Sequence, residues 1–590
     1  MIFRKILRKF LVWRVKHIRY RQFILLLSLI VGILSGLAAV VLKNSIYYTH
    51  YFLFQGQEIT DQNYFYLAYP LFGILITILF VKYLVKDNIG HGVARILYSI
   101  SKQKSSIKAH NSFSSIIAST LTIGFGGSVG SEAPIVLTGA SIGSNIAKTL
   151  HLDYRGRTLL IGCGSAGAIA GIFNAPLAGI IFTLEVLMLD LTLSSIVPLL
   201  ISSVSASTIA FFFMGKGFLL ESNIQIFDLK QIPYYLILGL ITGLVSIYFT
   251  KGTFFIESIF EKIKSPIKKL ILGGISLSIL IFFFPSLFGE GYEALQTILA
   301  GKASQLAEIQ QFNLSFNTGW LFIGYLILVL FFKVIAMSAT TGAGGVGGIF
   351  APTLFMGGIT GLIVSRVINI LSIHNVPEGN FALVGMGGLM AGVMHAPLTG
   401  IFLIAEITGG YSLFIPLMIT ATIAYITIIN FEPHSIYTKR LAQRGELLTH
   451  NADKAILTLM ELNKIIETDL KTISPEANLG ELVKVVAQSK RNIFPVINSQ
   501  NTFIGIILLD SIRDIMFDRD KYETTHVRDL MIMPPTYVSS SDNMDTVMKK
   551  FAETRVWNLP VIDNGKYIGF ISKSKIFNSY RDILTKYSTE

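Results

Sequence analysis

The sequence predicts an all-α polytopic membrane domain followed by a cytoplasmic α/β domain, and three observations support this fold class. Of 590 residues, 52% are hydrophobic and only 14% are charged, with a mean hydropathy of +0.60. Soluble proteins carry about a quarter charged residues. The part before Phe431 contains an internal duplication. After Phe431 charged residues reach the density of an ordinary soluble domain.

The N-terminal segment 1–22 is strongly basic, with eight Lys or Arg residues and no acid. The positive-inside bias predicts that this end stays cytoplasmic, at the plasma (inner) membrane. The apolar run behind it is too long for a secretory signal. Because the basic segment precedes a membrane span, we interpret the net charge of +13 as affinity for lipid headgroups, not for nucleic acid. The single cysteine, Cys163, excludes an intramolecular disulfide.

Uncharged stretches long enough to enter a bilayer recur through residues 23–431, the predicted membrane domain. Phe23–Leu42 is uncharged for 20 residues, enough to cross about 30 Å of hydrocarbon as a helix. Further apolar stretches lie at Tyr64–Val81, Pro233–Thr250, Leu270–Gly289, Trp320–Phe332 and Tyr411–Asn430.

The membrane domain contains two related halves, at about 23–215 and 233–431. Gly171–Glu185 matches Gly392–Glu406 at seven of fifteen positions, an offset of 221 residues. Gly124–Pro134 matches Gly342–Pro352 at six of eleven, an offset of 218 residues. The nearly equal offsets indicate that both matches come from one duplication.

Each half contains an apolar span interrupted by proline and glycine. These spans, Thr158–Leu184 and Gly379–Ala405, contain no Lys, Arg, Asp or Glu. Such composition predicts pairs of short helices with a break between them. Broken helices at matching places in two halves are typical of repeat-built transporters, whose binding site lies near mid-membrane. The alternative is that the glycines only allow close helix packing.

Glu132 is the only ionisable residue between Asn111 and Ala147, and it lies in a glycine-rich stretch before Pro134. A helix N-terminus buried in the membrane offers free amides and a partial positive charge, which attract an anion. A carboxylate at that place competes with a permeant anion when ionised and releases the path when protonated. The alternative is an ordinary N-cap. We favour a gate.

The segments GSEAP, FNAPLAGIIFTLE, GGIFAP and APLTG with its following Glu together resemble the CLC chloride channels and proton-coupled chloride transporters. The resemblance covers most of the membrane domain and extends to the tail. It implies the inverted-repeat CLC fold, with about eighteen mostly tilted helices, some broken or re-entrant. It also implies a homodimer with one anion pathway in each subunit and chloride as the permeant ion.

The resemblance carries over a set of site residues. Glu132 matches the gating glutamate, although the family's GREGP reads GSEAP here. In the first motif, GHGVA, His91 replaces the anion-coordinating serine, which leaves anion selectivity open. Spacing alone favours an interfacial aromatic for Tyr437, which matches the family's anion-contacting tyrosine. The expected anion-binding residues are His91, Gly92, Gly130, Ser131, Ile349, Phe350 and Tyr437.

The position after Glu185 distinguishes two modes of transport in the family. Proton-coupled members usually carry an inner glutamate there, and this chain has Val186. We therefore expect channel-like conduction, with chloride/proton antiport as the alternative because some exchangers dispense with that acid. Glu185 and Glu406 are interpreted as structural, bonded to backbone at helix ends. Lys333 either snorkels to the membrane surface or adds positive potential to the pathway.

The tail after the linker 432–454 contains two copies of one pattern, at 455–522 and 527–586. Each has a helical stretch, two β-rich runs around a turn, and another helix; Asn564–Gly565 is a strong hairpin signal. The pair resembles tandem CBS domains, which often bind adenine nucleotides. Ser572 is the possible nucleotide contact, but Leu508 and Lys575 depart from the nucleotide-binding pattern. A purely structural role is an equal alternative.

Other classes fit less well. A CBS-regulated divalent-cation channel would need clustered acids within the membrane, and an intramembrane enzyme would need a nucleophile–base pair or a metal cluster. We find neither, and expect a transporter that requires no metal and no cofactor, with homodimer formation, lipids and small inorganic anions as its interactions.

Overall fold

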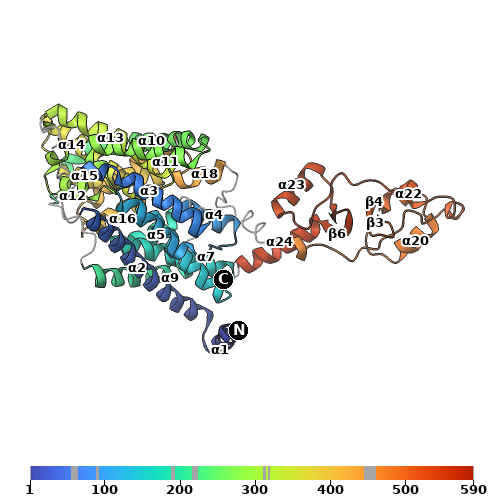
Figure 1. Cartoon of the computed structure of the whole chain (residues 1–590). Helices are drawn as coiled ribbons and strands as arrows, with labels where there is room; N and C mark the ends of the chain where they lie inside the picture. Colours follow the sequence, from blue (N-terminus) through green and yellow to red (C-terminus); the bar gives the residue numbers. More distant parts are fainter. Residues whose placement is uncertain are drawn as a thin grey trace. The chain divides into compact units, whose positions relative to one another are not determined.

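The computed structural model describes residues 2–54, 64–87, 89, 92–187, 193–215, 224–309, 314–315, 319–443, 460 and 462–588. The chain divides into two compact units, Met1–Leu447 and Leu448–Glu590. The first is a bundle of helices, and the second combines short antiparallel hairpins with helices (Figure 1).

Helices make up nearly all of the described part of the first unit. In chain order they are α1 (Ile2–His17), α2 (Tyr20–Phe54), η1 (Tyr64–Leu67), α3 (Tyr69–Leu79), η2 (Phe80–Val85), α4 (Gly92–Lys102), α5 (Asn111–Gly124), α6 (Glu132–Thr149), α7 (Tyr154–Phe173), α8 (Pro176–Val186), α9 (Leu193–Met214), η3 (Leu229–Gln231), α10 (Ile232–Lys262), α11 (Pro266–Phe283), η4 (Pro285–Leu287), α12 (Tyr292–Leu299), η5 (Ala303–Ala307), α13 (Gly319–Gly342), α14 (Phe350–Ile370), α15 (Glu378–Met394), α16 (Pro397–Ile407), α17 (Phe414–Ile429) and α18 (Ile436–Gln443). A two-stranded ladder pairs β1 (Glu308–Ile309) with β2 (Leu314–Ser315).

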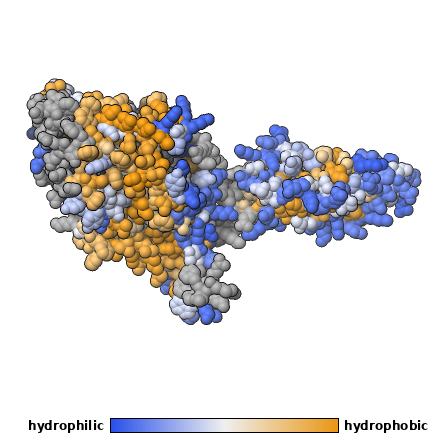
Figure 2. Space-filling model, viewed as in Figure 1, coloured by the Kyte–Doolittle hydropathy of each residue, from blue (hydrophilic) through white to orange (hydrophobic). Residues whose placement is uncertain are grey.

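Eight helices among the described residues are long and apolar enough to cross a membrane. The first, α2, spans 35 residues and so extends past the stretch expected from its uncharged core. Exposed Leu236, Leu240 and Leu244 on α10 belong to a broad apolar surface (Figure 2). Such a surface is stable against lipid, not against water.

Both predicted helix breaks are confirmed. The first separates α7 from α8 at Asn174, whose φ of 56° ends the helix in the left-handed region. The second separates α15 from α16 at His395, with a φ of 55°. A proline opens the next helix in each case, where its missing amide hydrogen costs nothing.

Glycine pairs let the helices of each half approach closely. A Cβ at Gly139 of α6 would collide with the carbonyl of Gly164 of α7, and the reverse collision also holds. Gly357 of α14 and Gly385 of α15 repeat this arrangement in the second half. The four positions obey the two offsets of the duplication, so the repeat seen in the sequence is also a repeat in packing.

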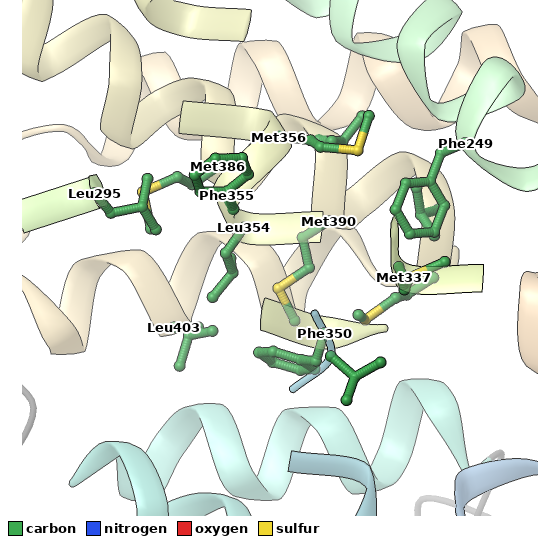
Figure 3. Close-up of a cluster of buried hydrophobic side chains, with 14 of the residues drawn as sticks. Phe249, Leu295, Met337, Phe350, Leu354, Phe355, Met356, Met386, Met390 and Leu403 are labelled. Atoms are coloured by element: carbon green, nitrogen blue, oxygen red, sulfur yellow. The ribbon is translucent and has the colours of Figure 1, made fainter. Parts of the chain in front are cut away.

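The helices of the second half enclose an apolar core. Figure 3 shows Phe350, Leu354 and Phe355 of α14 in one cluster with Met386 and Met390 of α15. All five side chains are at most 1% exposed. This core fixes the first turn of α14, which borders the site described below.

The second unit contains two similar hairpins. In the first, β3 (Ile493–Ile497) pairs with β4 (Phe503–Leu508), and in the second, β5 (Asn558–Asp563) pairs with β6 (Lys566–Ser572). The helices and 3-10 turns around them are η7 (Leu462–Lys464), α20 (Leu479–Ala487), α21 (Leu509–Ile512), η8 (Arg519–Lys521), α22 (Val527–Leu530), α23 (Met544–Thr554) and α24 (Lys573–Ser588). The expected Asn564–Gly565 turn is present, with φ values of 50° and 79°.

Candidate functional site

The two duplicated glycine segments meet in the first unit. The amide of Gly130 donates to the carbonyl of Gly348 at 2.8 Å, and the amide of Gly348 donates back to Gly130 at 2.6 Å. These residues are 218 positions apart, so equivalent residues of the two halves bond to each other. The antiparallel bridge brings the N-termini of α6 and α14 together.

Glu132 begins α6 at this junction. Its side chain is 1% exposed, and its Oε2 atom accepts no hydrogen bond of normal geometry. The amides of Glu132 itself and of Ala351, in the first turn of α14, nevertheless face the carboxylate. A Cβ at Gly130 would lie 3.0 Å from the Ala351 amide nitrogen. A side chain at Gly130 would therefore fill the space between the two helix N-termini.

The segment before α12 supplies two further polar groups to Glu132 and its neighbour. The Tyr292 hydroxyl donates to Oε1 of Glu132 at 2.5 Å. The Ser131 amide donates to Oε1 of Glu290 at 2.8 Å. One N-terminal amide of α6, expected to face an anion, is thus bonded to a carboxylate of the protein.

Two lysines balance these acids. Lys333 of α13 is 0% exposed, so it does not snorkel; its Nζ donates to Ser128 Oγ at 2.8 Å and to the Gly289 carbonyl at 3.4 Å. Lys43 of α2 donates to the Ile172 carbonyl at 3.2 Å. Lys43 lies within electrostatic range of Glu132 and Glu290. Buried charges are tolerated when they are paired in this way.

The start of α4 and the helix α18 complete the surroundings. Gly92 packs against Ala133, since a Cβ there would collide with the Ala133 carbonyl. Tyr437 of α18 is 6% exposed and within electrostatic range of Glu132, and its buried hydroxyl has no hydrogen-bond partner among the described residues. The expected contact His91 lies outside the described residues.

The remaining residues expected in the pathway border the same junction. Ile349 is the N-cap of α14 and provides no side-chain cap. The buried ring of Phe350 stacks on Phe173 at 5.3 Å. Val186, at the end of α8, is 4% exposed.

The structural interpretation of Glu185 and Glu406 is confirmed. Glu185 accepts hydrogen bonds from the amides of Leu398 and Thr399 at 3.0 and 2.7 Å, at the start of α16. Glu406 accepts from the amides of Leu177 and Ala178 at 3.0 and 2.8 Å, at the start of α8. Each carboxylate therefore caps the equivalent helix of the other half.

In the second unit, Ser572 lies at the end of β6 and is 7% exposed. Its Oγ accepts a hydrogen bond from the Lys575 amide at 3.2 Å, in the first turn of α24. The hydroxyl expected to contact a nucleotide thus caps a helix. Throughout the described residues, no group of three or more His, Cys, Asp or Glu side chains is placed to hold a metal ion.

Sequence reasoning missed Glu290, Tyr292 and Lys43. The acid and the tyrosine belong to Gly289–Glu293, GEGYE, which follows an apolar stretch. An acid flanked by glycines is the same local signal that singled out Glu132. Lys43 offers no such signal, because a lone lysine near the end of an apolar run usually snorkels.

Comparison with known families agrees with this architecture. The sequence profile described as "Voltage gated chloride channel" matches residues 72–428, more than half of the chain. The profile of the CBS domain matches twice, at residues 462–518 and 527–582.

Individual relatives are similar over most of the first unit. The "Putative chloride channel protein ClcB-like" of Ralstonia nicotianae is 29% identical over 387 residues, covering 64% of this chain and 86% of the relative. The "H(+)/Cl(-) exchange transporter ClcA" of Klebsiella pneumoniae is 27% identical over 418 residues, covering 67% and 84%.

Solved structures share the fold. A slow cyanobacterial Cl-/H+ antiporter has a TM-score of 0.60 at 23% identity, covering 74% of this chain and all of that chain. A eukaryotic CLC transporter has a TM-score of 0.61 at 16% identity, covering 94% and 97%. A CLC-type fluoride/proton antiporter has a TM-score of 0.59 at 21% identity, covering 71% and 98%.

Proposed function

The chain belongs to the voltage-gated chloride channel family, whose members transport anions, and from that premise we propose that it carries chloride or a similar monovalent anion past Glu132. The observation that supports this route is the buried Glu132 carboxylate between the N-termini of α6 and α14. Helix N-termini favour negative charge. The ionised side chain therefore occupies the place that a permeant anion would take.

The surroundings of Glu132 favour an anion over a cation. Lys43 and Lys333 compensate Glu290 and Glu132. When Glu132 is protonated, the four groups together carry one net positive charge, which one monovalent anion neutralises. The buried Tyr437 hydroxyl is a further donor for such an anion. His91 in place of the family's serine leaves the choice among chloride, fluoride and similar anions to measurement.

Liposome flux tests the proposal. Purified wild-type protein is expected to release chloride from vesicles, faster as the pH falls and Glu132 becomes protonated. The Glu132→Gln variant should conduct at neutral pH and lose most of this pH dependence. Glu293→Gln, which neutralises an exposed acid of α12, is the matched control. Vesicles that pass cations but not halides, or identical wild-type and Glu132→Gln flux at every pH, would contradict the proposal.

We propose channel-like conduction, because the inner proton-glutamate position is occupied by the buried Val186. Chloride/proton antiport is the second candidate. It is favoured by Glu290 and Tyr292, ionisable groups next to Glu132, and by similarity to relatives named as exchangers. Imposing a pH gradient distinguishes the two: an exchanger moves chloride against its gradient, and a channel does not.

The proposal extends to the assembly and its setting. We propose a homodimer in the plasma (inner) membrane, with segment 1–22 and the CBS pair in the cytoplasm, no cofactor and no nucleic-acid partner. For the CBS pair we favour a structural role over adenine nucleotide binding, since the Ser572 hydroxyl caps α24. Calorimetric titration of the full chain with ATP tests this choice, and saturable heat would favour nucleotide binding.

A further inference from the structure

The segment Gly289–Tyr292, which we call the latch segment, is bonded along the loop that precedes α6. The Gly289 amide donates to the Gly126 carbonyl at 3.2 Å. Glu290 accepts from the Ser131 amide at 2.8 Å, and Tyr292 donates to Glu132 at 2.5 Å. Alternate residues of the latch segment thus engage consecutive residues of α6.

A buried cation holds the latch segment and the loop together. Lys333 donates to the Gly289 carbonyl at 3.4 Å and to Ser128 Oγ at 2.8 Å. Its Nζ also lies 4.9 Å from the centre of the Phe355 ring, in the core of α14. Because Lys333 contacts both sides, the Tyr292 hydroxyl is delivered to Glu132 by a segment fixed at several points.

We propose that Tyr292 is a positioning residue that latches the Glu132 side chain in the place where it closes the anion pathway. This inference rests on the proposed function, since it assigns a holder to that gate. The bond is charge-assisted when Glu132 is ionised, and bonds of this kind are shorter and stronger than neutral ones. Its length of 2.5 Å agrees with that description.

The other charged and ionisable groups around Glu132 come from four further parts of the fold. They are Lys43 of α2, Glu290 of the latch segment, Lys333 of α13 through Glu290, and Tyr437 of α18. None of them donates a printed hydrogen bond to Glu132, so the Tyr292 hydroxyl is the side-chain donor that the structure describes there. Removing this hydroxyl weakens the closed position and also destabilises the ionised carboxylate. Both effects favour opening.

The Tyr292→Phe variant tests the latch, because it removes one oxygen and leaves the ring, Glu290 and Lys333 in place. We expect chloride flux at neutral pH to rise by about tenfold or more, as for the loss of a hydrogen bond to a charged group. The pH at which flux is half maximal should move upward by about one unit or more. Tyr248→Phe is the matched control: its hydroxyl donates to the Phe331 carbonyl at 2.8 Å, away from the gate.

The outcomes separate the latch from the function beneath it. If wild-type vesicles transport chloride and Glu132→Gln alters the flux, but Tyr292→Phe matches wild type in rate and pH profile, the latch is wrong and the gate stands. A fall in flux with normal thermal stability would also overturn the latch. If wild-type vesicles move no anion, the proposed function fails first, and the latch fails with it.

Discussion

At the residue scale, Glu132 and Glu290 place two carboxylates beside the first turn of one helix, with Lys43 and Lys333 as their counter-ions. Charges of like sign at short range cannot both remain ionised without such compensation. The two acids also differ in their bonds, because Glu290 accepts a backbone amide and Glu132 a phenolic hydroxyl. Their contributions to gating should therefore differ in sign when each is altered.

Glu290→Gln should close the gate more firmly. The glutamine oxygen still accepts from the Ser131 amide, but the two lysines then compensate Glu132 alone and stabilise its ionised form. We expect the pH of half-maximal chloride flux to fall by about one unit, since charges a few ångströms apart in a partly buried site interact by a few kcal/mol. This shift is opposite to that expected for Tyr292→Phe. An upward shift in a pH series of vesicle flux would refute the electrostatic role, and Glu293→Gln serves as the control.

Asp87, outside the membrane spans, should contribute to stability in a pH-dependent manner. Partial burial acts to raise the pKa of its carboxyl, but hydrogen bonds from Arg95, Lys108 and His110 outweigh it and hold the pKa well below the usual value. A lowered folded-state pKa means that the stabilisation is present above the unfolded pKa of about 3.9 and is lost as the pH falls.

Asp87→Asn should accordingly lower the melting temperature at pH 7, with a loss on the order of 1 kcal/mol for this partly exposed cluster. The difference from wild type should shrink below about pH 4, where the wild-type carboxyl also begins to lose its charge. Melting curves across pH measure this directly. A difference that stays constant down to pH 3 would show that the bonds stabilise through shape and not through charge.

At the element scale, the broken helices were predictable and the latch was not. Pro176 and Pro397 lack an amide hydrogen, so the sequence marks each helix start, and the matching repeats place both breaks in register. The contact between Ser131 and Glu290 joins residues 159 positions apart, and no local periodicity encodes it. The long α2 exceeded its expected bounds because polar residues near its ends also adopt helical structure.

The reciprocal caps of α8 and α16 should stabilise the junction between the two halves. Glu185→Ala leaves the amides of Leu398 and Thr399 without their carboxylate, and Glu406→Ala does the same to Leu177 and Ala178. Each variant should lose about 2 kcal/mol, the upper end for a helix cap. Thermal unfolding in detergent measures the loss, with the exposed Glu293→Ala as control. Unequal effects, one near zero, would contradict the equivalence of the two caps.

At the scale of the whole molecule, the site belongs to both halves of one unit. Gly130 bonds to Gly348, and the Val346 amide donates to Thr122 as the Ser128 amide donates to Thr340, at 3.0 and 3.3 Å. All three relations obey the 218-residue offset. A single half would leave the N-terminus of α6 without the opposing α14, so neither half alone can form the pathway.

A chain ending at Leu447 should therefore retain anion transport. The described residues around Glu132, namely Lys43, Glu290, Tyr292, Lys333 and Tyr437, all lie in the unit Met1–Leu447. The C-terminal hairpins have hydrophobic clusters of their own, at residues 460–576, so their removal exposes little of the membrane unit's core. We expect flux within a few-fold of the full chain, the same response to pH, and the same gain from Glu132→Gln. Size-exclusion chromatography reports whether the shortened chain is folded. A folded but silent truncated protein would mean that the C-terminal unit helps to open the pathway, and that the gate is not set by the membrane unit alone.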